Sequence, residues 1–238
     1  MEDKIQQFKQ LVNKCDNIVF FGGAGVSTES GIPDFRSKDG LYNQQYKYPP
    51  ETILSHTFFM NKTEEFFKFY KLKMNSLKYQ PNITHIKLAE LETKGKLKAV
   101  ITQNIDGLHQ KAGSKVVYEL HGSVLRNYCM NCNKFYDAEY VFNSNGIPRC
   151  SCGGIIKPDV VLYEEGLDEE TIEKSICAIQ NADLLIVAGT SLTVQPASGL
   201  INYFRGKNLV LINRDSTLYD NKANLVINDS LGKVFSKL

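Results

Sequence analysis

The stretch Gly22–Arg36, with the sequence GGAGVSTESGIPDFR, decides the fold. It follows the apolar segment Ile18–Phe21, whose residues are typical of a buried strand. Gly23, Ala24 and Gly25 then leave the backbone open enough for a phosphate group to approach closely. A strand followed by such a glycine turn is the outline of a nucleotide-binding unit.

The usual dinucleotide fingerprint has a third glycine three residues after the second, and here that position holds Thr28. By spacing alone, an ordinary glycine turn between a strand and a helix explains the motif equally well. The second half of the stretch, Gly31–Arg36, contains Pro33 and has no periodicity, so we expect a loop there.

The 238-residue chain is long enough for one large domain with a smaller insert. Its net charge of +2 is spread over mixed lysines and acids, which gives no electrostatic case for binding DNA, RNA or a membrane surface. The N-terminus lacks the layout of a signal peptide, and no apolar run approaches the ~18 residues of a spanning helix. We therefore expect a cytoplasmic protein.

Helical and strand-like patterns alternate along the chain. Periodicity and capping signals predict helices over residues 5–15, 63–81, 84–94 and 168–182, and another from Pro196 onward. Short apolar runs predict strands over residues 18–21, 99–102, 116–120, 184–188, 209–213 and 225–227. Strands separated by helices imply an α/β fold, with a parallel sheet covered on both faces.

Parallel sheets bind ligands beyond the carboxyl ends of their strands. Five segments follow expected strands and are rich in glycine or polar groups: residues 22–36, 103–107, 121–122, 189–191 and 213. Their convergence on one edge of the sheet favours nucleotide binding more strongly than the glycine motif does by itself.

Four of the six cysteines form two close pairs with seventeen residues between them, Cys129 with Cys132 and Cys150 with Cys152. This spacing is typical of four-thiolate zinc ribbons, in which the metal has no open position for catalysis. We therefore expect one structural zinc ion. Cys15 and Cys177 fall in helical patterns, which predicts that both are buried packing residues.

A zinc ribbon can also bind nucleic acid, and a noncatalytic binding module is the alternative function from another class. The basic residues Lys134, Arg149 and Lys157 are nearly balanced by Asp137 and Glu139. A nucleic-acid-binding face is usually more basic. We therefore expect no direct nucleic-acid partner, and nothing in the sequence implies an oligomer.

Together, these motifs resemble those of the sirtuins, NAD-dependent protein-lysine deacylases. The matches occur in the family's order: Gly23–Ser27, Gly31–Arg36, Gln103–Asp106, His121–Gly122, the four cysteines and Gly189–Leu192. The resemblance implies a compact bacterial-type enzyme with a Rossmann-like NAD-binding domain formed by residues 1–38, 82–125 and 158–238. Residues 39–81, a helical insert, and 126–157, the zinc module, would form a small domain.

The resemblance also implies NAD as co-substrate and acylated lysine in proteins or peptides as substrate, with nicotinamide, deacylated lysine and acyl-ADP-ribose as products. His121, as general base, and Asn104 would be the catalytic residues. The implied NAD-binding residues are Gly23, Ala24, Gly25, Ser27, Thr28, Asp34, Phe35, Arg36, Gln103, Asn104, Ile105, Asp106, Gly189, Thr190, Ser191, Asn213 and Arg214. Within this set, residues 34–36 belong to a loop that closes over NAD.

The residues alone leave two roles open. From chemistry, His56, His85 or His109 could equally be the base or have a purely structural role, although His121 follows an expected strand. Asp106 could simply cap a turn, as aspartate before glycine commonly does. An enzyme that cleaves NAD or transfers ADP-ribose on the same scaffold is the alternative activity.

Substrate peptides of the family pair with the strand after the last zinc ligands. The implied contact residues here are Val160, Val161, Leu162 and Tyr163. Main-chain pairing of this kind gives affinity with little sequence demand. Glu164 stands where the family usually has glycine, and we hypothesise that it favours basic peptides.

Acyl selectivity is expected to depend on Tyr70 and Lys73. Sirtuins that remove succinyl groups carry a Tyr-x-x-Arg pair on the helix that lines the acyl pocket, and Lys73 replaces that arginine. Lysine lacks the planar fork that binds a carboxylate through two hydrogen bonds. We therefore expect removal of acetyl groups, or of longer neutral acyl groups, rather than of succinyl groups.

Overall fold

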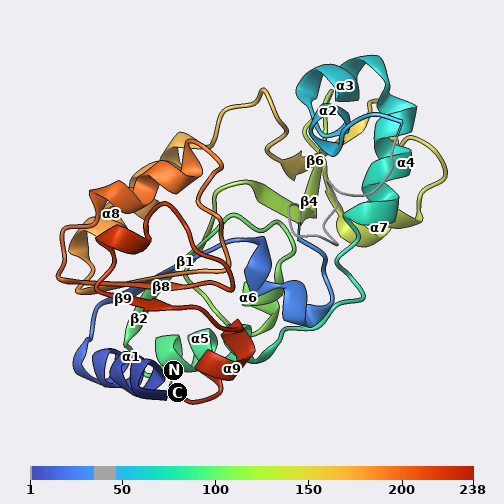
Figure 1. The fold of residues 1–238 in the computed structure, drawn as a ribbon. Coiled ribbons are helices and arrows are strands. Elements are labelled where there is room, and N and C mark those ends of the chain that lie inside the picture. Colours follow the sequence, from blue (N-terminus) through green and yellow to red (C-terminus); the bar gives the residue numbers. More distant parts are fainter. Residues whose placement is uncertain (1, 35–46) are drawn as a thin grey trace.

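The computed structural model describes residues 2–34 and 47–238. Its larger sheet has six parallel strands in the order β3-β2-β1-β7-β8-β9 (Figure 1). The strands are β1 Ile18–Gly22, β2 Leu97–Thr102, β3 Val117–Glu119, β7 Leu184–Ala188, β8 Asn208–Ile212 and β9 Leu225–Ile227. This is the doubly wound order of dinucleotide-binding folds, in which the chain reverses direction across the sheet between β1 and β7. The predicted α/β fold is confirmed.

Helices cover both faces of the sheet, because side chains of each buried strand alternate between two cores. On one face, Phe20 packs with Phe8 and Phe235 against α1 Glu2–Lys14, α5 Ile83–Thr93 and α9 Leu231–Phe235. On the other face, Phe21 lies in a cluster with side chains of α8 Glu169–Asn181 and of the 3-10 helix η4 Ala197–Tyr203. Figure 1 shows α8 above the sheet and α1, α5 and α9 below it.

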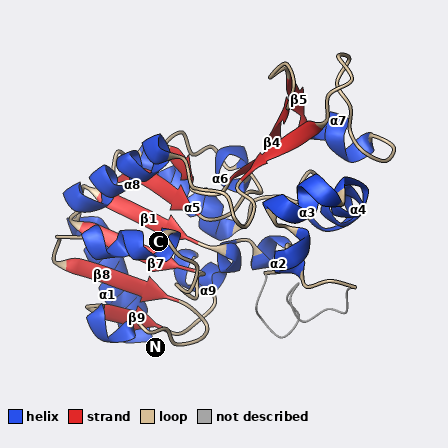
Figure 2. Ribbon diagram, turned by 90° about the horizontal axis from the view of Figure 1, so that it is seen from above, coloured by secondary structure: helices blue, strands red, loops and turns tan. Residues whose placement is uncertain are grey.

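A second part of the molecule lies beyond the carboxyl ends of the large sheet's strands, on the side to which their arrows point (Figure 2). Its described residues form a three-stranded antiparallel sheet in the order β5-β4-β6 and four helices. These elements are β4 Gly122–Cys129, β5 Phe135–Asp137, β6 Ile156–Val160, α2 Pro50–Ile53, α3 His56–Asn61, α4 Thr63–Lys73 and α7 Ala138–Asn143. The expected domain boundaries at 125–126 and 157–158 fall inside β4 and β6.

An aromatic cluster forms the core of this second part. Phe66 contacts Phe59 and Phe67 edge-on and stacks on Tyr70, which in turn stacks on Phe142 of α7. The helical insert is therefore joined to the cysteine-bearing segment by ring packing, which adds directional contacts to apolar burial.

Helix α4 ends earlier than its sequence pattern predicts. We expected it to include Met74 and Leu77 and to stop at Pro81, but it ends at Lys73. The amide N–H of Leu77 donates to the side-chain oxygen of Asn75, so a local turn competes with the helix.

Several short helices have no clear sequence pattern. Pro50 begins α2 at its first turn, where a proline is tolerated. The hydroxyl of Ser55 accepts from the N–H of Phe58 and caps α3. The short helix α6 Leu108–Lys111 follows the loop after β2, and α9 follows the last strand of the large sheet.

The prediction for Cys177 is wrong, because its side chain is exposed on α8, whereas Cys15 is buried as expected. None of the helices in residues 2–34 and 47–238 has both the length and the apolar character needed to cross a bilayer.

Candidate active site

Two glycine loops meet where β1 and β7 end, at the switch point of the sheet. The N–H of Gly25 donates to the carbonyl oxygen of Gly189 at 2.8 Å. A Cβ on Gly25 would lie 2.8 Å from Cα of Gly189, and a Cβ on Gly189 would lie 2.5 Å from the backbone nitrogen of Val26. Gly189 also has a φ of +60°. The two loops therefore touch backbone to backbone, which only glycine permits.

Thr28 occupies the place of the missing third glycine, and its side chain stabilises the turn by a hydrogen bond to the backbone. Its hydroxyl donates to the carbonyl oxygen of Gly25 at 3.0 Å. The chain between them forms the 3-10 helix η1 Ala24–Val26, which continues into η2 Thr28–Ser30. The incomplete fingerprint is thus a cradle closed by a threonine side chain.

The loop after β2 brings two polar side chains to this cradle. The hydroxyl of Ser27 donates to Asp106 at 2.6 Å, and the side-chain amide of Asn104 donates to the same hydroxyl oxygen at 3.1 Å. Asp106 also accepts from the N–H of Leu108 at 2.9 Å and so caps the start of α6. Burial raises the pKa of Asp106, and the hydrogen bond from Ser27 opposes that rise. Asp106 is therefore a turn cap and a member of the cluster at once.

A second polar chain joins the loops after β2, β7 and β8. The side-chain amide of Gln103 donates to the hydroxyl of Thr190 at 3.0 Å, and the N–H of Thr190 donates to Oδ1 of Asn213 at 2.9 Å. Nδ2 of Asn213 is buried and has no hydrogen-bond partner among the described residues. An orphaned amide donor beside a glycine cradle fits a polar ligand such as NAD.

The remaining residues expected to bind NAD lie outside this network of buried polar side chains. Ser191 and Arg214 are exposed, with the Ser191 hydroxyl 2.9 Å from that of Thr193. Asp34 ends the described part of its loop, and Phe35 and Arg36 lie outside the described residues.

His121 lies directly before β4 and is held by a main-chain group of the loop after β2. Its Nδ1 is 2.9 Å from the carbonyl oxygen of Gln103. Because a carbonyl can only accept, Nδ1 carries the proton and Nε2 keeps a lone pair. Burial lowers the pKa of His121, although the hydrogen bond to Gln103 opposes this. The side chain is thus a neutral imidazole oriented to accept a proton at Nε2.

The other histidines are arranged differently. His85 and His109 face each other with ring centroids 4.7 Å apart, and both are fully enclosed. Burial lowers the pKa of His85 to about 4 and that of His109 well below its ordinary value. His56 lies on α3, where its Nδ1 is 2.9 Å from Glu165. Packing thus assigns His85 and His109 to the core, while His121 lies at the edge where the loops converge.

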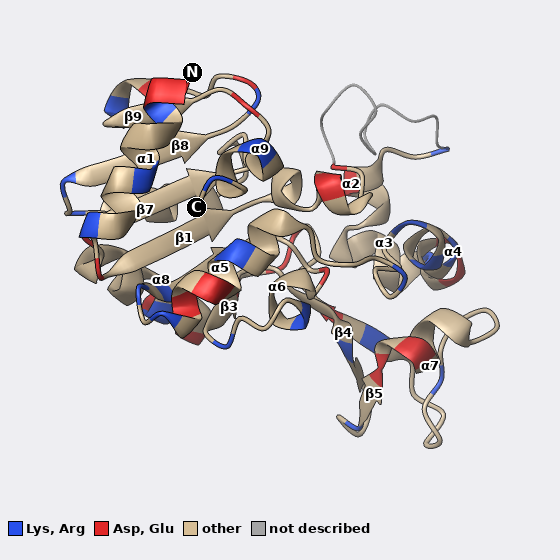
Figure 3. Cartoon of the chain, turned by 90° about the horizontal axis from the view of Figure 1, so that it is seen from below, with Lys and Arg blue, Asp and Glu red and all other residues tan. Residues whose placement is uncertain are grey.

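The four paired cysteines form one cluster, as the spacing predicts. Their Sγ atoms all lie within 4.8 Å of one another, with Cys129 3.4 Å from Cys152 and Cys132 3.5 Å from Cys150. Tetrahedral zinc with bonds of about 2.3 Å needs sulfur separations of about 3.8 Å, so the cluster fits the metal with little adjustment. Charges of both signs lie on the strands and helix around it (Figure 3).

The segment expected to bind the peptide is tightly held by its own chain. The N–H of Val161 donates to the carbonyl oxygen of His121, and that of Tyr163 donates to Leu54. The N–H of Leu162 donates to the carboxylate of Glu165. Three consecutive amide donors are therefore engaged. In the described part of the chain no donor is paired with the carbonyl of Val161.

Glu164 has a backbone conformation that explains why glycine is usual there. Its φ is +77°, in the region that glycine adopts without strain. Its carboxylate accepts from the N–H of Thr57 at 2.9 Å, at the start of α3. The hypothesis that Glu164 selects basic peptides stays a prediction.

The structure does not bring Tyr70 to an open surface. Its ring is completely buried in the aromatic cluster and its hydroxyl has no hydrogen-bond partner among the described residues. Lys73 is partly exposed at the end of α4. Any role of Tyr70 in acyl selectivity therefore depends on the packing of the cluster, against which Ile105 also lies.

Sequence reasoning missed the charged side chains that surround the peptide segment. Glu165 binds His56 through one carboxylate oxygen and Lys157 through the other, and Lys157 also donates to the carbonyl of Val160. The resemblance offered one signal, since glutamate is usual at the position of Glu165. No local pattern distinguishes Lys157 from a surface lysine.

A doubly wound sheet with a glycine cradle, a neutral histidine and a four-cysteine module defines a nucleotide-dependent enzyme with a structural metal site. The family model described as Sir2 family matches residues 23–196, more than half of the chain. The chain belongs to the Sir2 family, so the predicted sirtuin resemblance is confirmed.

Curated relatives and solved structures agree with this assignment. The chain is 62% identical to an NAD-dependent protein deacetylase of Clostridium perfringens, over 100% of this chain and 99% of the relative. A relative of the same name from Clostridium acetobutylicum is also 62% identical, over 98% of this chain and 96% of its own length. The structure of a Sir2 protein with a p53 peptide and NAD+ matches with a TM-score of 0.87 at 39% identity, over 98% of this chain and 96% of that one.

Proposed function

We propose that this chain removes acetyl groups from protein lysines with NAD as co-substrate and one molecule of water, giving nicotinamide, the free lysine and O-acetyl-ADP-ribose. The full-length relatives named NAD-dependent protein deacetylases support this activity. A further solved Sir2 structure, described as holding a deacetylated p53 peptide and 3′-O-acetyl-ADP-ribose, matches with a TM-score of 0.90 at 38% identity, over 98% of this chain and 96% of that one.

The observation that carries the proposal is the 2.9 Å contact between Nδ1 of His121 and the carbonyl oxygen of Gln103. Loss of nicotinamide from NAD leaves an electron-poor ribose carbon that the acyl oxygen of the substrate can attack. His121 accepts the proton of a ribose hydroxyl at Nε2, since its Nδ1–H is held by Gln103. Asn104, Ser27 and Asp106 orient the nicotinamide end, and the cradle at Gly25 holds the diphosphate.

The four cysteines hold one zinc ion in our proposal. Four thiolates leave no open coordination position, so the metal stabilises the small domain without taking part in the reaction. We also propose that the enzyme works in the cytoplasm, where thiols stay reduced and available to zinc.

The discriminating experiment measures nicotinamide release with and without an acetyl-lysine peptide. We expect release to depend on the peptide and to fall by about 10²–10⁴-fold in His121→Ala, the usual contribution of a general base. Cys177→Ser, on the exposed face of α8, is the matched surface variant and should keep full activity. Equal NAD consumption without peptide would instead favour an NAD-cleaving or ADP-ribose-transferring enzyme.

A further inference from the structure

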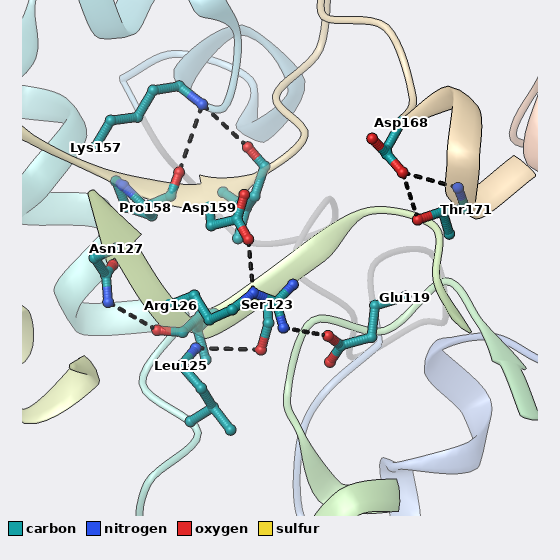
Figure 4. A network of polar contacts seen from close by, with 12 residues as sticks. Glu119, Ser123, Leu125, Arg126, Asn127, Lys157, Pro158, Asp159, Asp168 and Thr171 are labelled. Atoms are coloured by element: carbon teal, nitrogen blue, oxygen red, sulfur yellow. Dashed lines mark hydrogen bonds and ion pairs between the residues drawn. The ribbon is translucent and has the colours of Figure 1, made fainter. Parts of the chain in front are cut away.

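A single arginine connects the two sheets of the molecule. Arg126 on β4 binds Asp159 of β6 through Nε at 2.7 Å and Glu119, the last residue of β3, through a terminal nitrogen at 2.7 Å (Figure 4). Glu119 belongs to the large sheet and Asp159 to the small one. The side chain therefore spans the junction at which the two parts meet.

Both carboxylates flank segments of the proposed active site. Glu119 comes two residues before His121, and Asp159 directly precedes Val160 of the peptide segment. The backbones of these segments also touch, because a Cβ on Gly122 would overlap the carbonyl oxygen of Asp159. Arg126 thus binds a carboxylate next to each of these two touching segments.

The strand that carries Arg126 is irregular at this point. Ser123 pairs with Asp159 and Asn127 pairs with Pro158, so residues 124–126 bulge out of the ladder with β6. Within the bulge, the N–H of Val124 donates to the carbonyl of Ile105 at 2.9 Å. On its other edge β4 stays paired, with Arg126 opposite Asp137 of β5. Toward β6 the ladder is interrupted, and there the side chain of Arg126 bonds to Asp159.

The two ion pairs have different surroundings. The side chain of Glu119 is only 7% exposed, whereas that of Asp159 is 43% exposed. A buried carboxylate without its partner is strongly destabilising, while a half-exposed pair contributes little to stability. Loss of Arg126 should therefore lower the stability mainly because the buried carboxylate of Glu119 loses its partner. Any change in the position of the peptide segment should result from the lost bond to Asp159.

We propose that Arg126 is a positioning residue for peptide binding, which fixes the segment from Val160 to Tyr163 relative to His121 through its bond to Asp159. The inference rests on the proposed deacetylase function, and it adds a residue that does not itself touch the reacting atoms. The planar guanidinium suits this task, since it binds two carboxylates in fixed directions at once.

The test separates positioning from stability by means of three variants. Arg126→Gln should raise the KM for an acetyl-lysine peptide about tenfold and lower the Tm. The double variant R126Q/E119Q should regain much of the lost Tm, because the unpaired buried charge is gone, yet keep the raised KM. Asp159→Asn should raise the KM to a similar extent. Lys174→Gln, which breaks the exposed pair with Glu170 on α8, should leave both quantities unchanged.

Direct binding of a fluorescent acetyl-peptide gives a readout that needs no turnover. A peptide Kd that is equal in wild type and Arg126→Gln would overturn the inference, as would full recovery of peptide affinity in R126Q/E119Q. Failure of the proposed function looks different, because the wild-type protein would then release no nicotinamide in the presence of the peptide.

Discussion

At the scale of single residues, the protonation of His121 decides whether the proposed base can act. A base must be neutral, and burial lowers the pKa of His121 below the ordinary value of about 6.5. Lowering the pKa means that the neutral form persists to lower pH, so activity should be lost only as pH falls through that reduced pKa.

We therefore predict that the acidic limb of the kcat/KM profile has its midpoint below pH ~6.5. The measurement is peptide-dependent nicotinamide release between about pH 5 and 8 in buffers of constant ionic strength. Acetyl-lysine carries no titrating group, so the limb reports the enzyme. A midpoint at or above the ordinary histidine value would contradict the buried, neutral imidazole described for His121.

At the scale of structural elements, the contact between the loops after β1 and β7 rests on Gly189. Alanine at this position would combine a left-handed backbone with a Cβ only 2.5 Å from the nitrogen of Val26. We predict that Gly189→Ala lowers the free energy of unfolding by about 2–4 kcal/mol and weakens NAD binding, from strain and overpacking together.

Gly146 provides the matched control for this substitution. Its φ of +62° equals that of Gly189 within 2°, but a Cβ there would meet no atom within 4 Å. Gly146→Ala should therefore cost only the backbone strain, about 1–2 kcal/mol in chemical denaturation, and leave NAD affinity unchanged. If Gly189→Ala and Gly146→Ala lowered the free energy of unfolding and the NAD affinity equally, the close approach of the two loops would be unimportant.

The cysteine module gives a second prediction at this scale. We expect one zinc ion per chain by elemental mass spectrometry, and its loss in Cys129→Ser, since three thiolates bind the metal less tightly. The variant should also melt at a lower temperature, because β4, β5 and β6 lose the metal that links their ends. Cys177→Ser should retain the zinc, and a zinc content unaffected by Cys129→Ser would exclude the four-thiolate site.

The regular elements of the large sheet were predictable because their patterns are local, whereas the strands β4, β5 and β6 of the small sheet were not predicted from such patterns. The six strands of the large sheet and its three long helices follow from short apolar runs and helical periodicity. The end of α4 was not predictable, because the turn that follows it is held by a hydrogen bond from the backbone N–H of Leu77 to the side chain of Asn75. Short helices such as α2 and α6 contain too few residues to show a period.

The candidate site likewise has features that the sequence predicts and features that only the folded chain shows. Glycine loops, paired cysteines and His121 are conspicuous in the sequence, because their chemistry restricts the residue types. The bond between His121 and Gln103, and the bridge from Arg126 to Glu119 and Asp159, join segments that meet only in the folded chain. The wrong prediction for Cys177 has a related cause, since a helical pattern alone does not specify the face on which a residue lies.

At the scale of the whole molecule, the two parts contribute different surroundings to one site. The large sheet supplies polar loops at its carboxyl edge, whereas the small part supplies an aromatic core. Ile105, in the loop after β2, packs against that core. If the acyl chain binds beside the Asn104–Asp106 loop, as our proposal requires, its surroundings include the apolar side chain of Ile105 and the aromatic core behind it.

This arrangement predicts which acyl groups are removed. A succinyl carboxylate would have to give up its water beside the aromatic cluster, with Lys73 as the cation and no planar fork to bind both of its oxygens. We predict that kcat/KM for a succinyl-lysine peptide is at least about tenfold below that for the acetyl form of the same peptide, while butyryl is tolerated. Lys73→Arg should reduce the difference in kcat/KM between the two peptides. Lys68→Arg, at an exposed position on α4, should leave this difference unchanged. A higher rate on the succinyl peptide than on the acetyl peptide would refute the predicted preference for neutral acyl groups.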